Sequence, residues 1–290
     1  MSLHVATSAA AFLERVEEFL VRAGAEGELT YGLLGRLSLH PDFYDEVLLV
    51  ALLDAKGAPT AVVTRTDAFP LLVVAPEGLD AEQLALLVDH LAATDAFPDE
   101  VNGAEHASRA VAAAIAARTG RSLQPDLGTI AHELRHLVPP ARPAAGHMEA
   151  AGPDLRSLLS DWTTRFYVEA LGPGHPTSAG GLAQAESTVD RLLPNRDLMV
   201  WRDGTGAPVA MAGVNRRTPR SSTVSLVYTP PDLRGRGFAS AVVHALTARE
   251  LAAGQSWTSL FTDAANPTTN RIYRALGYEP RARFTCWTLS

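Results

Sequence analysis

Cysteine and lysine are nearly absent from this sequence: Cys286 is its single cysteine, and Lys56 is the single lysine among 25 basic residues. One thiol cannot form an internal disulfide, which excludes the disulfide-stabilised secreted class. Long apolar runs are also missing, since none approaches the roughly 18 residues of a membrane-spanning helix. The segment from Ala9 to Ala25 is amphipathic and interrupted by glutamates, unlike a signal peptide. We therefore expect a cytoplasmic protein without a membrane partner.

Two nucleotide-binding signatures are missing as well. A dinucleotide-binding fingerprint needs Gly-x-Gly-x-x-Gly with an acidic residue about 20 positions later, and no such pattern occurs. A P-loop needs Gly-Lys-Ser or Gly-Lys-Thr, and Lys56 does not lie in such a sequence. The sequence therefore favours neither dinucleotide nor nucleoside triphosphate binding.

The chain also lacks a dense basic stripe. Residues 1–145 contain 10 basic and 20 acidic side chains, a net charge of −10, while residues 146–290 contain 15 and 12, a net charge of +3. The total of −7 gives no electrostatic footprint for nucleic acid, so we expect no nucleic-acid partner. The small basic excess of the second half is suited to a smaller anionic ligand.

What is present is an ordinary globular composition, 47% hydrophobic, in a chain long enough for about two domains. A proline-rich stretch of small residues runs from Pro139 to Gly146. Its prolines exclude helix and favour an extended tether. We expect a first domain at 1–138, a linker at 139–146 and a second domain at 147–290.

A glycine-rich loop stands out in the second half. Arg234-Gly235-Arg236-Gly237-Phe238-Ala239-Ser240 lies between the apolar run Val224 to Tyr228 and a helical pattern from Ala241 to Ala253. Its two glycines let the backbone turn sharply, so that successive N–H groups and the positive end of the helix dipole can bind an anion. Taken alone, this signal is weak, because an ordinary strand-to-helix turn can have the same composition.

A second motif begins about thirty residues later, Asn-Pro-Thr-Thr-Asn-Arg-Ile-Tyr-Arg-Ala-Leu-Gly-Tyr from Asn266 to Tyr278. Asn266 and Tyr273 are separated by about two helical turns and share one helix face. The loop fills the pattern Arg-x-x-Gly-x-Ala with Arg234, Gly237 and Ala239. In order and spacing, the two motifs resemble those of the GCN5-related N-acetyltransferase superfamily.

This resemblance implies an acyl-CoA N-acyltransferase fold from about residue 150 to 290, with acetyl-CoA as co-substrate and no metal. In the superfamily, the strand before the loop splays from its neighbour and leaves backbone groups free for the pantetheine and the thioester. Here that strand is Ser225 to Thr229. The cofactor-binding residues that the resemblance implies are Val227, Tyr228, Thr229, Arg234, Gly235, Arg236, Gly237, Phe238, Ala239, Ser240, Asn266, Asn270 and Tyr273.

Tyr273 is the general acid that the resemblance implies. Acetyl transfer needs a neutral amine, a donor for the thioester oxygen and a proton for the departing thiolate. A phenol with a pKa near 10 keeps its proton at neutral pH and can give it to that thiolate. Two alternatives stay open: Tyr273 could only pack against the cofactor, and Asn266 could be the N-cap of the helix that begins at Pro267.

The general base is weakly indicated. Glu169, His175 and Asp263 are all placed to line a cleft at the carboxyl ends of strands, and any of them could instead be a solvated surface residue. Deprotonation of the amine through water is a further possibility. An acyl-cysteine route is not expected, because Cys286 has no base beside it in the sequence and lies in the final strand.

His132-Glu133-Leu134-Arg135-His136 matches the His-Glu-x-x-His pattern of zinc proteases. That chemistry needs a helix, which brings both imidazoles to one face. Here the apolar and polar residues alternate as on a strand, and in a strand the two histidines lie about 13 Å apart along the axis. We expect a strand and no metal site.

The element order predicts an α/β (α+β) fold with a mixed, mostly antiparallel sheet. The second half predicts helices at 154–170, 182–193 and 241–253 and a helix bearing Tyr273, a loop at 172–181, and strands at 197–202, 208–215, 223–228, 257–262, 278–280 and 283–289. The first half repeats this order with helices at 8–23, 29–37, 80–97 and 105–118 and strands at 47–53, 60–66, 71–75, near 101 and at 127–137.

The repetition predicts two acetyltransferase-like domains in tandem, although an unrelated α/β domain would give a similar order. The first half has Pro76-Glu77-Gly78-Leu79-Asp80-Ala81 where the phosphate loop should fall, and no tyrosine between Ser108 and Ala117. We therefore interpret it as a degenerate copy of the second.

The function we expect is an acetyl-CoA-dependent N-acetyltransferase that acts by direct attack of a primary amine in a ternary complex. The acceptor would be a small molecule or a peptide, and the protein a monomer or a homodimer. The alternative is a non-catalytic acyl-CoA-binding sensor, which would have no need of Tyr273 as a proton donor.

Overall fold

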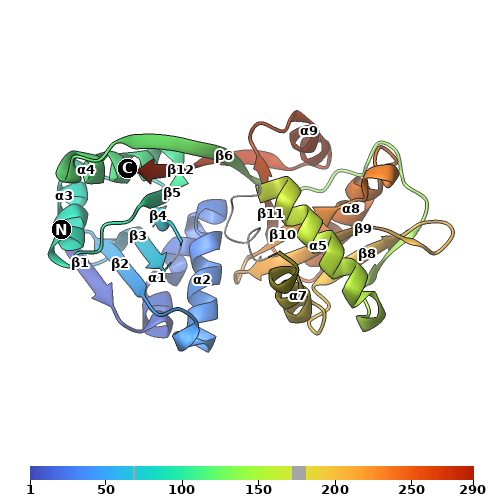
Figure 1. Cartoon of the computed structure of the whole chain (residues 1–290), viewed down its shortest axis with the longest axis horizontal. Coiled ribbons are helices and arrows are strands. Elements are labelled where there is room, and N and C mark those ends of the chain that lie inside the picture. Colours follow the sequence, from blue (N-terminus) through green and yellow to red (C-terminus); the bar gives the residue numbers. More distant parts are fainter. Residues whose placement is uncertain (68, 172–180) are drawn as a thin grey trace. The chain divides into compact units, whose positions relative to one another are not determined.

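The computed structural model describes residues 1–67, 69–171 and 181–290, which divide into two compact units (Figure 1). The amino-terminal unit consists of Met1–Ala131 and Pro280–Ser290, and the carboxyl-terminal unit of His132–Glu279. These boundaries differ from the expected domains at 1–138 and 147–290. The chain crosses between units before the proline-rich stretch, and its last residues return to the first unit.

The amino-terminal unit begins with a short strand and two helices. Ser8 caps the first long helix, accepting the Ala11 N–H through its side chain at 3.4 Å, as expected of serine at an N-cap. The elements are β1 (Ser2–Ala6), α1 (Ala9–Arg22), α2 (Glu28–Leu39), β2 (Val47–Leu53), β3 (Pro59–Thr66), β4 (Leu71–Val74), α3 (Ala81–Ala93), β5 (Glu100–Ala104), α4 (Glu105–Thr119) and β6 (Leu123–Leu134), with short 3-10 turns at Gly24–Glu26 and Pro41–Phe43.

The carboxyl-terminal part of the chain repeats the same order. The elements are β7 (His147–Ala150), α5 (Arg156–Leu171), α7 (Gly181–Leu192), β8 (Leu198–Arg202), β9 (Pro208–Arg217), β10 (Ser221–Tyr228), α8 (Phe238–Ala252), β11 (Trp257–Asp263), α9 (Pro267–Ala275) and β12 (Glu279–Leu289), with 3-10 turns at Pro153–Leu155 and Pro231–Leu233. The predicted loop at 172–181 lies, except for its last residue, outside the described residues.

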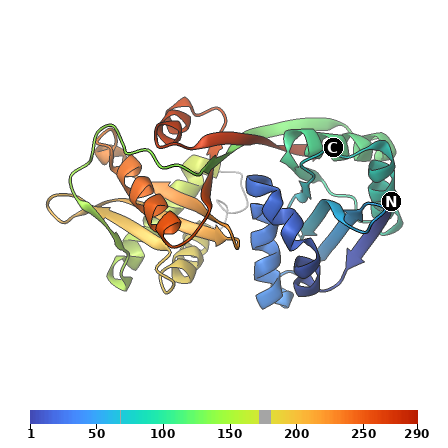
Figure 2. The same cartoon turned by 180° about the vertical axis from the view of Figure 1, so that it is seen from behind.

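The two units have matching strand orders within one 12-stranded sheet. The order is β1-β2-β3-β4-β5-β12 in the amino-terminal unit and β7-β8-β9-β10-β11 in the carboxyl-terminal one, and β6, which the unit boundary divides after Ala131, is the neighbour of both β12 and β11. Parallel pairing occurs at the same place in both, between β4 and β5 and between β10 and β11, while the other registered pairs are antiparallel. The predicted mixed, mostly antiparallel fold and the internal repetition are therefore confirmed. Figure 2 shows strands and helices in each unit from the other side.

The last strand of each unit comes from the other repeat. β12 follows α9 in the chain but pairs with β5 of the amino-terminal unit, Phe284 opposite Ala104. The end of β6 follows α4 but is the neighbour of β11 in the carboxyl-terminal unit. One continuous β12 also replaces the two short strands that we expected at the chain end.

The proline-rich stretch packs against its own unit and is no free tether. The Trp201 indole N–H donates to the Ala145 carbonyl at 3.1 Å, and the Val138 N–H donates to the Leu276 carbonyl at 3.0 Å. Gly146, with φ of +121°, lies against the Arg202 carbonyl, where a Cβ would clash. Proline excludes helix here, as predicted, but these contacts hold the segment in place.

The strand exchange predicts that residues 147–290 will not fold as a separate domain. That fragment lacks the end of β6, the neighbour of β11, and carries β12 without its partner β5. We expect the fragment to show no cooperative thermal unfolding by circular dichroism, whereas the full chain does. A fragment that melts cooperatively and is stabilised by CoA would contradict this prediction.

Helices cover both faces of the carboxyl-terminal sheet. Along β8, Leu198 and Val200 pack in a cluster with α5 and α7, while Met199 and Trp201 pack in another with α8 and α9. This alternation follows from the two-residue period of a strand, and burial of both faces explains the nearly continuous apolar runs.

A buried carboxylate fixes the outer end of this sheet. The Glu250 side chain is 4% exposed and accepts hydrogen bonds from Ser222 at 2.6 Å, Arg249 at 2.7 Å and Arg217 at 3.2 Å. Arg217 also pairs with Asp197 at 2.7 Å. Burial alone would raise the pKa of Glu250, but these hydrogen bonds outweigh it and hold the pKa below its ordinary value.

Replacing this carboxylate should weaken the fold. We expect Glu250→Ala to lower the free energy of unfolding by about 2–3 kcal/mol, below the value for a fully buried pair because both arginines are partly exposed. Since its folded pKa is depressed, Glu250 stabilises the fold fully above its unfolded pKa and loses that effect as the pH falls toward the folded pKa. Urea unfolding at pH 7 and pH 4 measures this. An equal difference between variant and wild type at both values would contradict the linkage.

The remaining differences from the predicted elements are small. β1 and β7 were not predicted, and α8 begins at Phe238, three residues before the expected helix. Among the helices that the structure describes, none is long and apolar enough to cross a bilayer.

Candidate functional site

The parallel strands β10 and β11 pair over only part of their length. Pairing runs from Ser221 opposite Trp257 to Thr223 opposite Ser259 and ends there, although β10 continues to Tyr228 and β11 to Asp263. The backbone groups on the facing edges beyond Thr223 and Ser259 are therefore outside the ladder. This is where the resemblance implied a splayed strand.

A bulge in β10 adds to this divergence. Its register against β9 shifts between Ser225 and Tyr228, and Leu226 has a φ of +54°, which is rare for a non-glycine residue. Val227 is partly buried and Tyr228 is 3% exposed, so both side chains pack in the core. Only the backbone of Val227 and Tyr228 is suited to contact a ligand.

The glycine-rich loop presents unpaired amides. Gly235 and Gly237 have φ of +77° and +83°, and Gly237 is the N-cap of α8 without a side-chain cap. In the described part of the chain, no backbone N–H group from Gly235 to Ser240 has a hydrogen-bond partner, while the Ala241 N–H bonds the Gly237 carbonyl at 3.0 Å. Such a nest of N–H groups at a helix amino terminus binds anions.

The two arginines of the loop differ in their contacts. Arg234 donates to the Thr229 carbonyl at 2.9 Å and to the Glu169 carboxylate at 2.7 Å, and its guanidinium lies 5.8 Å from the centre of the Tyr228 ring. These bonds tie the loop to the ends of β10 and α5. Arg236 is exposed, donates a hydrogen bond to the Asp232 carbonyl at 3.3 Å and is close enough to Asp203 to contribute to the lowered pKa of that carboxyl, and it forms no salt bridge among the described residues.

The ion pair between Arg234 and Glu169 affects whether Glu169 could act as the general base. The Glu169 and Arg234 side chains are 46% and 49% exposed, so the pair adds little stability, but it occupies the carboxylate. The Glu169 charge also raises the pKa of Tyr228, after burial, which is the larger cause. The structure thus favours a structural role for Glu169 over proton abstraction.

Both asparagines of the second motif hold the start of α9. Asn266 is its N-cap, with Oδ1 accepting the Thr268 and Thr269 N–H groups at 3.2 Å each. Asn270 is 9% exposed, and its amide donates to the Asp263 and Asn266 carbonyls. The N-cap interpretation of Asn266 therefore holds, and the Asn270 amide is occupied by protein groups, which disfavours the cofactor contact implied for it.

Tyr273 lies one turn further along α9. Its ring is 9% exposed and packs edge-on against Tyr278, with ring centres 6.0 Å apart, in the cluster that also contains Phe238 and Ala241 of α8. No residue that the structure describes hydrogen-bonds its hydroxyl. Burial, and to a lesser extent Tyr278, raises the pKa of Tyr273, so the phenol keeps its proton at neutral pH.

The other base candidates are less informative. Asp263 accepts the Ala265 N–H at 2.8 Å through Oδ1, forming the turn between β11 and α9. His175 lies outside the described residues. The geometry therefore assigns no general base, and deprotonation through water remains the interpretation with the fewest requirements.

The His-Glu-x-x-His sequence begins on a strand, as predicted. His132 and Glu133 lie in β6, which ends at Leu134 and precedes a bend that includes His136. His132 is fully buried against Thr262, and Glu133 lies 3.6 Å from Arg135. Across the described residues, no group of three or more His, Cys, Asp or Glu side chains is arranged to hold a metal ion.

The amino-terminal unit closes the equivalent loop. Asp80 caps α3 in a reciprocal capping box, since its Oδ1 accepts the Gln83 N–H and the Gln83 side chain accepts the Asp80 N–H, both at 2.8 Å. The His106 ring bonds the Ala75 carbonyl at 3.0 Å. The Asp80 and Gln83 side chains occupy two amides of this helix end, whereas the amides from Gly235 to Ser240 are unpaired, and Asp80 would repel an anion.

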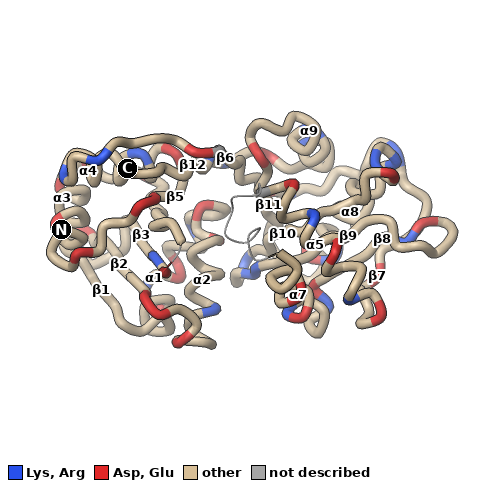
Figure 3. The backbone as a smooth tube through the Cα atoms, viewed as in Figure 1, with Lys and Arg blue, Asp and Glu red and all other residues tan. Residues whose placement is uncertain are grey.

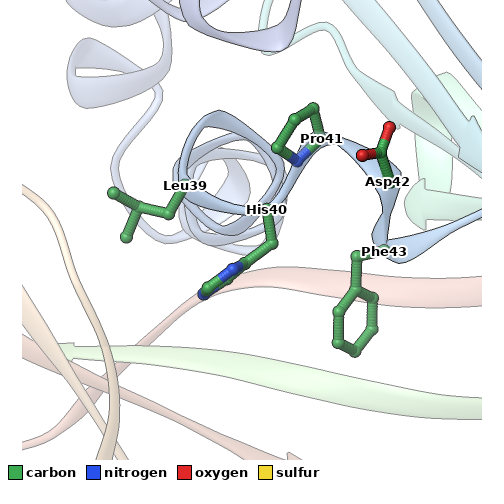
Figure 4. Close-up of a pocket in the computed structure, with 5 residues that line it drawn as sticks. All are labelled: Leu39, His40, Pro41, Asp42 and Phe43. Carbon is green, nitrogen blue, oxygen red and sulfur yellow. The ribbon is translucent and has the colours of Figure 1, made fainter.

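A hollow in the amino-terminal unit has a different character. It is lined by one continuous segment, Leu39–Phe43, at the end of α2 (Figure 4). The His40 and Phe43 rings point to the same side, while the Asp42 carboxylate points away from them. Because no polar groups converge there, this hollow has no arrangement for chemistry.

Arginines and acidic residues are interspersed along each unit (Figure 3). The nest at the start of α8 is the candidate for anion binding.

Sequence reasoning missed one part of this site. A Cβ added at Gly237 would lie 3.5 Å from the Arg142 carbonyl and 3.9 Å from the Ala144 Cβ, so the proline-rich stretch borders the loop. The Arg142 side chain is exposed and has no partner among the described residues. The sequence analysis did not identify Arg142 as part of the site, because Arg142 lies in the stretch interpreted as a tether. No local sequence pattern predicts a contact with residues about 95 positions away.

Comparisons with known proteins agree with this geometry. A family model described as FR47-like protein matches residues 204–288, which include β9, β10, the loop, α8, β11 and α9. A search of curated proteins finds no match.

Several solved structures share the fold over nearly the whole chain. An acetyltransferase of the GNAT family from Colwellia psychrerythraea has 12% identity, covers 100% of both chains and gives a TM-score of 0.60. A GCN5-related N-acetyltransferase from Sphaerobacter thermophilus has 17% identity, 99% and 95% coverage and a TM-score of 0.58. A tandem GNAT protein from the clavulanic acid biosynthesis pathway has 16% identity, 99% and 98% coverage and a TM-score of 0.55.

The chain therefore has the acyl-CoA N-acyltransferase fold of the GCN5-related N-acetyltransferase superfamily, and the predicted resemblance is confirmed. The likeness to a tandem protein agrees with the two units of this chain.

Proposed function

We propose that this protein is an N-acetyltransferase that moves an acetyl group from acetyl-CoA to a primary amine in a ternary complex. We assign the activity to the carboxyl-terminal unit and interpret the amino-terminal unit as a degenerate copy. The observation that carries the proposal is the run of unpaired amides from Gly235 to Ser240, which follows a strand whose pairing stops early.

These residues fit acetyl-CoA in two places. The amides of the loop are suited to its pyrophosphate, and Arg236 adds a positive charge beside them. The edge of β10 at Val227 and Tyr228, which lies outside the ladder with β11, is suited to the amide groups of the pantetheine arm, which hydrogen-bond like a neighbouring strand, and Thr229 follows directly. Acetyl-CoA supplies the acetyl thioester.

The chain's own residues would assist in two ways. Backbone N–H groups of the divergent part of β10 would donate to the thioester oxygen as it gains negative charge. Tyr273 would hold its proton until the thiolate departs and then donate it. Small-molecule or peptide amines fit the proposal as acceptors, and above its pKa the amine is already neutral and can attack. The nitrogen then loses one proton to water, which balances the proton that Tyr273 gives to the thiolate, and the Tyr273 phenolate regains a proton from solvent.

Screening pools of amines for thiol release from acetyl-CoA tests this function. We expect at least one pool to release CoA thiol at a rate well above hydrolysis, with an acetylated amine detected by mass spectrometry. CoA binding without turnover in any pool would favour the sensor instead. Added chelator should leave transfer unchanged, and loss of activity on chelation would contradict a metal-free mechanism.

A further inference from the structure

A buried series of side-chain hydrogen bonds links three elements of the carboxyl-terminal unit. His132 on β6 is fully buried, with Nε2 3.0 Å from the Thr262 hydroxyl of β11. The Thr262 hydroxyl lies in turn 2.6 Å from Oδ1 of Asn270 on α9. Neither Thr262 nor His132 has a role in the proposed chemistry described so far.

The available donors and acceptors determine which atom donates in each hydrogen bond of this series. The Asn270 carbonyl oxygen only accepts, because its amide nitrogen donates to the Asp263 and Asn266 carbonyls at 3.1 and 2.8 Å. Thr262 must therefore give its single proton to Asn270. The Thr262 oxygen can then only accept from His132, so the proton of the neutral imidazole lies on Nε2.

The other ring nitrogen supports a specific role for this side chain. Nδ1 of His132 is buried and has no partner among the residues that the structure describes. An unpaired buried acceptor costs folding stability. A side chain needed only to fill this space would avoid that cost by being apolar, whereas histidine provides the Nε2 donor. Burial also lowers the pKa of His132, and Arg274 adds to this against an opposing contact with Asn270, so the ring stays neutral.

The series of hydrogen bonds ends at α9, the helix that carries Tyr273. Asn270 bridges the end of β11 and the first turn of α9 and lies one turn before Tyr273. Fixing the Thr262 hydroxyl fixes the Asn270 amide, and the amide fixes how α9 leaves the strand. An error in that angle would be passed to the Tyr273 hydroxyl, because a helix turns as a rigid element.

We infer that His132 is a positioning residue for acetyl transfer, which holds α9 through Thr262 and Asn270 so that Tyr273 is aligned with the departing thiolate. This inference rests on the proposed function for its catalytic consequence. It assigns the histidine of the protease-like motif a role as a hydrogen-bond donor and gives it no contact with substrate or metal.

The tautomer can be tested without any substrate. Long-range proton–nitrogen correlation NMR on the full-length protein should show His132, assigned by its loss in His132→Gln, as a neutral ring protonated on Nε2. A ring protonated on Nδ1 would overturn the inference. Amide hydrogen exchange should be faster in α9 but not in α8 for His132→Leu, and unchanged for His132→Gln, because glutamine keeps an N–H donor at a similar reach.

Kinetics test the catalytic consequence with the acceptor found by the amine screen. We expect His132→Leu to lower kcat about 10–100-fold with the KM for acetyl-CoA within about threefold, and His132→Gln to retain most of kcat. Thr262→Val, a smaller change, should lower kcat similarly, and the double variant should be no worse than either single one. His90→Leu in the amino-terminal unit is the control.

The outcomes separate the possible roles. Equal loss in His132→Gln and His132→Leu would overturn positioning, because the lone pair or its titration would then be required. Lowered stability with unchanged kcat in His132→Leu would also overturn it. If the wild type transfers acetyl to no amine, the proposed function fails, whereas the NMR and exchange results still decide whether His132 holds α9.

Discussion

Tyr273→Phe should lower kcat for acetyl transfer by roughly two to four orders of magnitude while leaving acetyl-CoA affinity unchanged. The substitution removes the proton donor but keeps the ring that packs edge-on against Tyr278. Steady-state kinetics beside titration calorimetry on the same variant measure both quantities. Because burial raises the pKa of Tyr273, the acid form persists as the pH rises, and its ionisation should not lower kcat between pH 7 and 9.

Tyr278→Phe is the matched control. The Tyr278 hydroxyl is also buried, but it bonds Thr247 at 2.8 Å and Thr258 at 2.9 Å. We expect this variant to lose about 1–2 kcal/mol of folding stability and to keep its kcat. If Tyr273→Phe retained wild-type turnover, Tyr273 would only pack, and the general-acid role would be abandoned.

Gly237→Asp should abolish measurable CoA binding, a loss of at least about 100-fold in affinity. Gly237 has a φ of +83°, a region that costs an ordinary residue about 1–2 kcal/mol, and it borders the unpaired amides. An aspartate there would also bring negative charge to the helix end that must accept phosphate. Titration calorimetry with CoA measures the loss.

Gly206→Asp controls for backbone strain. Gly206 has a nearly equal φ of +86°, lies in the turn between β8 and β9, and has open space where a Cβ would be added. It should lose a similar amount of stability and bind CoA normally. Equal affinity losses in the two variants would mean that strain, and not the nest, explains the effect.

Local sequence patterns predicted most helices and strands, because neighbouring residues determine where these elements form. β2 begins at Val47 and ends at Leu53, as its run of apolar residues indicated, and α1 (Ala9–Arg22) lies within the helix predicted at 8–23. β1 and β7 were missed because each is only four or five residues long and has no clear alternation. The exchange of β6 and β12 could not be predicted, since the repeats have the same strand order and either last strand would satisfy the local pattern.

In the candidate site too, features set by neighbouring residues could be predicted, whereas contacts between residues far apart in the sequence could not. Two glycines and a following helix pattern were enough to predict a nest, and the structure leaves those amides unpaired. The contacts of Glu169 with Arg234 and of His132 with Thr262 join residues 65 and 130 positions apart, and no sequence pattern reports them. The packed proline-rich stretch was interpreted as a tether for the same reason.

The stoichiometry of CoA binding to the full chain tests the central claim most directly. In the described residues, every amide from Gly235 to Ser240 is unpaired, whereas Asp80 and Gln83 occupy two amides of the equivalent helix end in the other unit and Asp80 places a carboxylate there. Titration calorimetry should therefore give one CoA per chain, and Asp80→Ala should not create a second site, since the glycine pair is also missing there. Two sites per chain, or a single site that survives Gly237→Asp, would contradict the account.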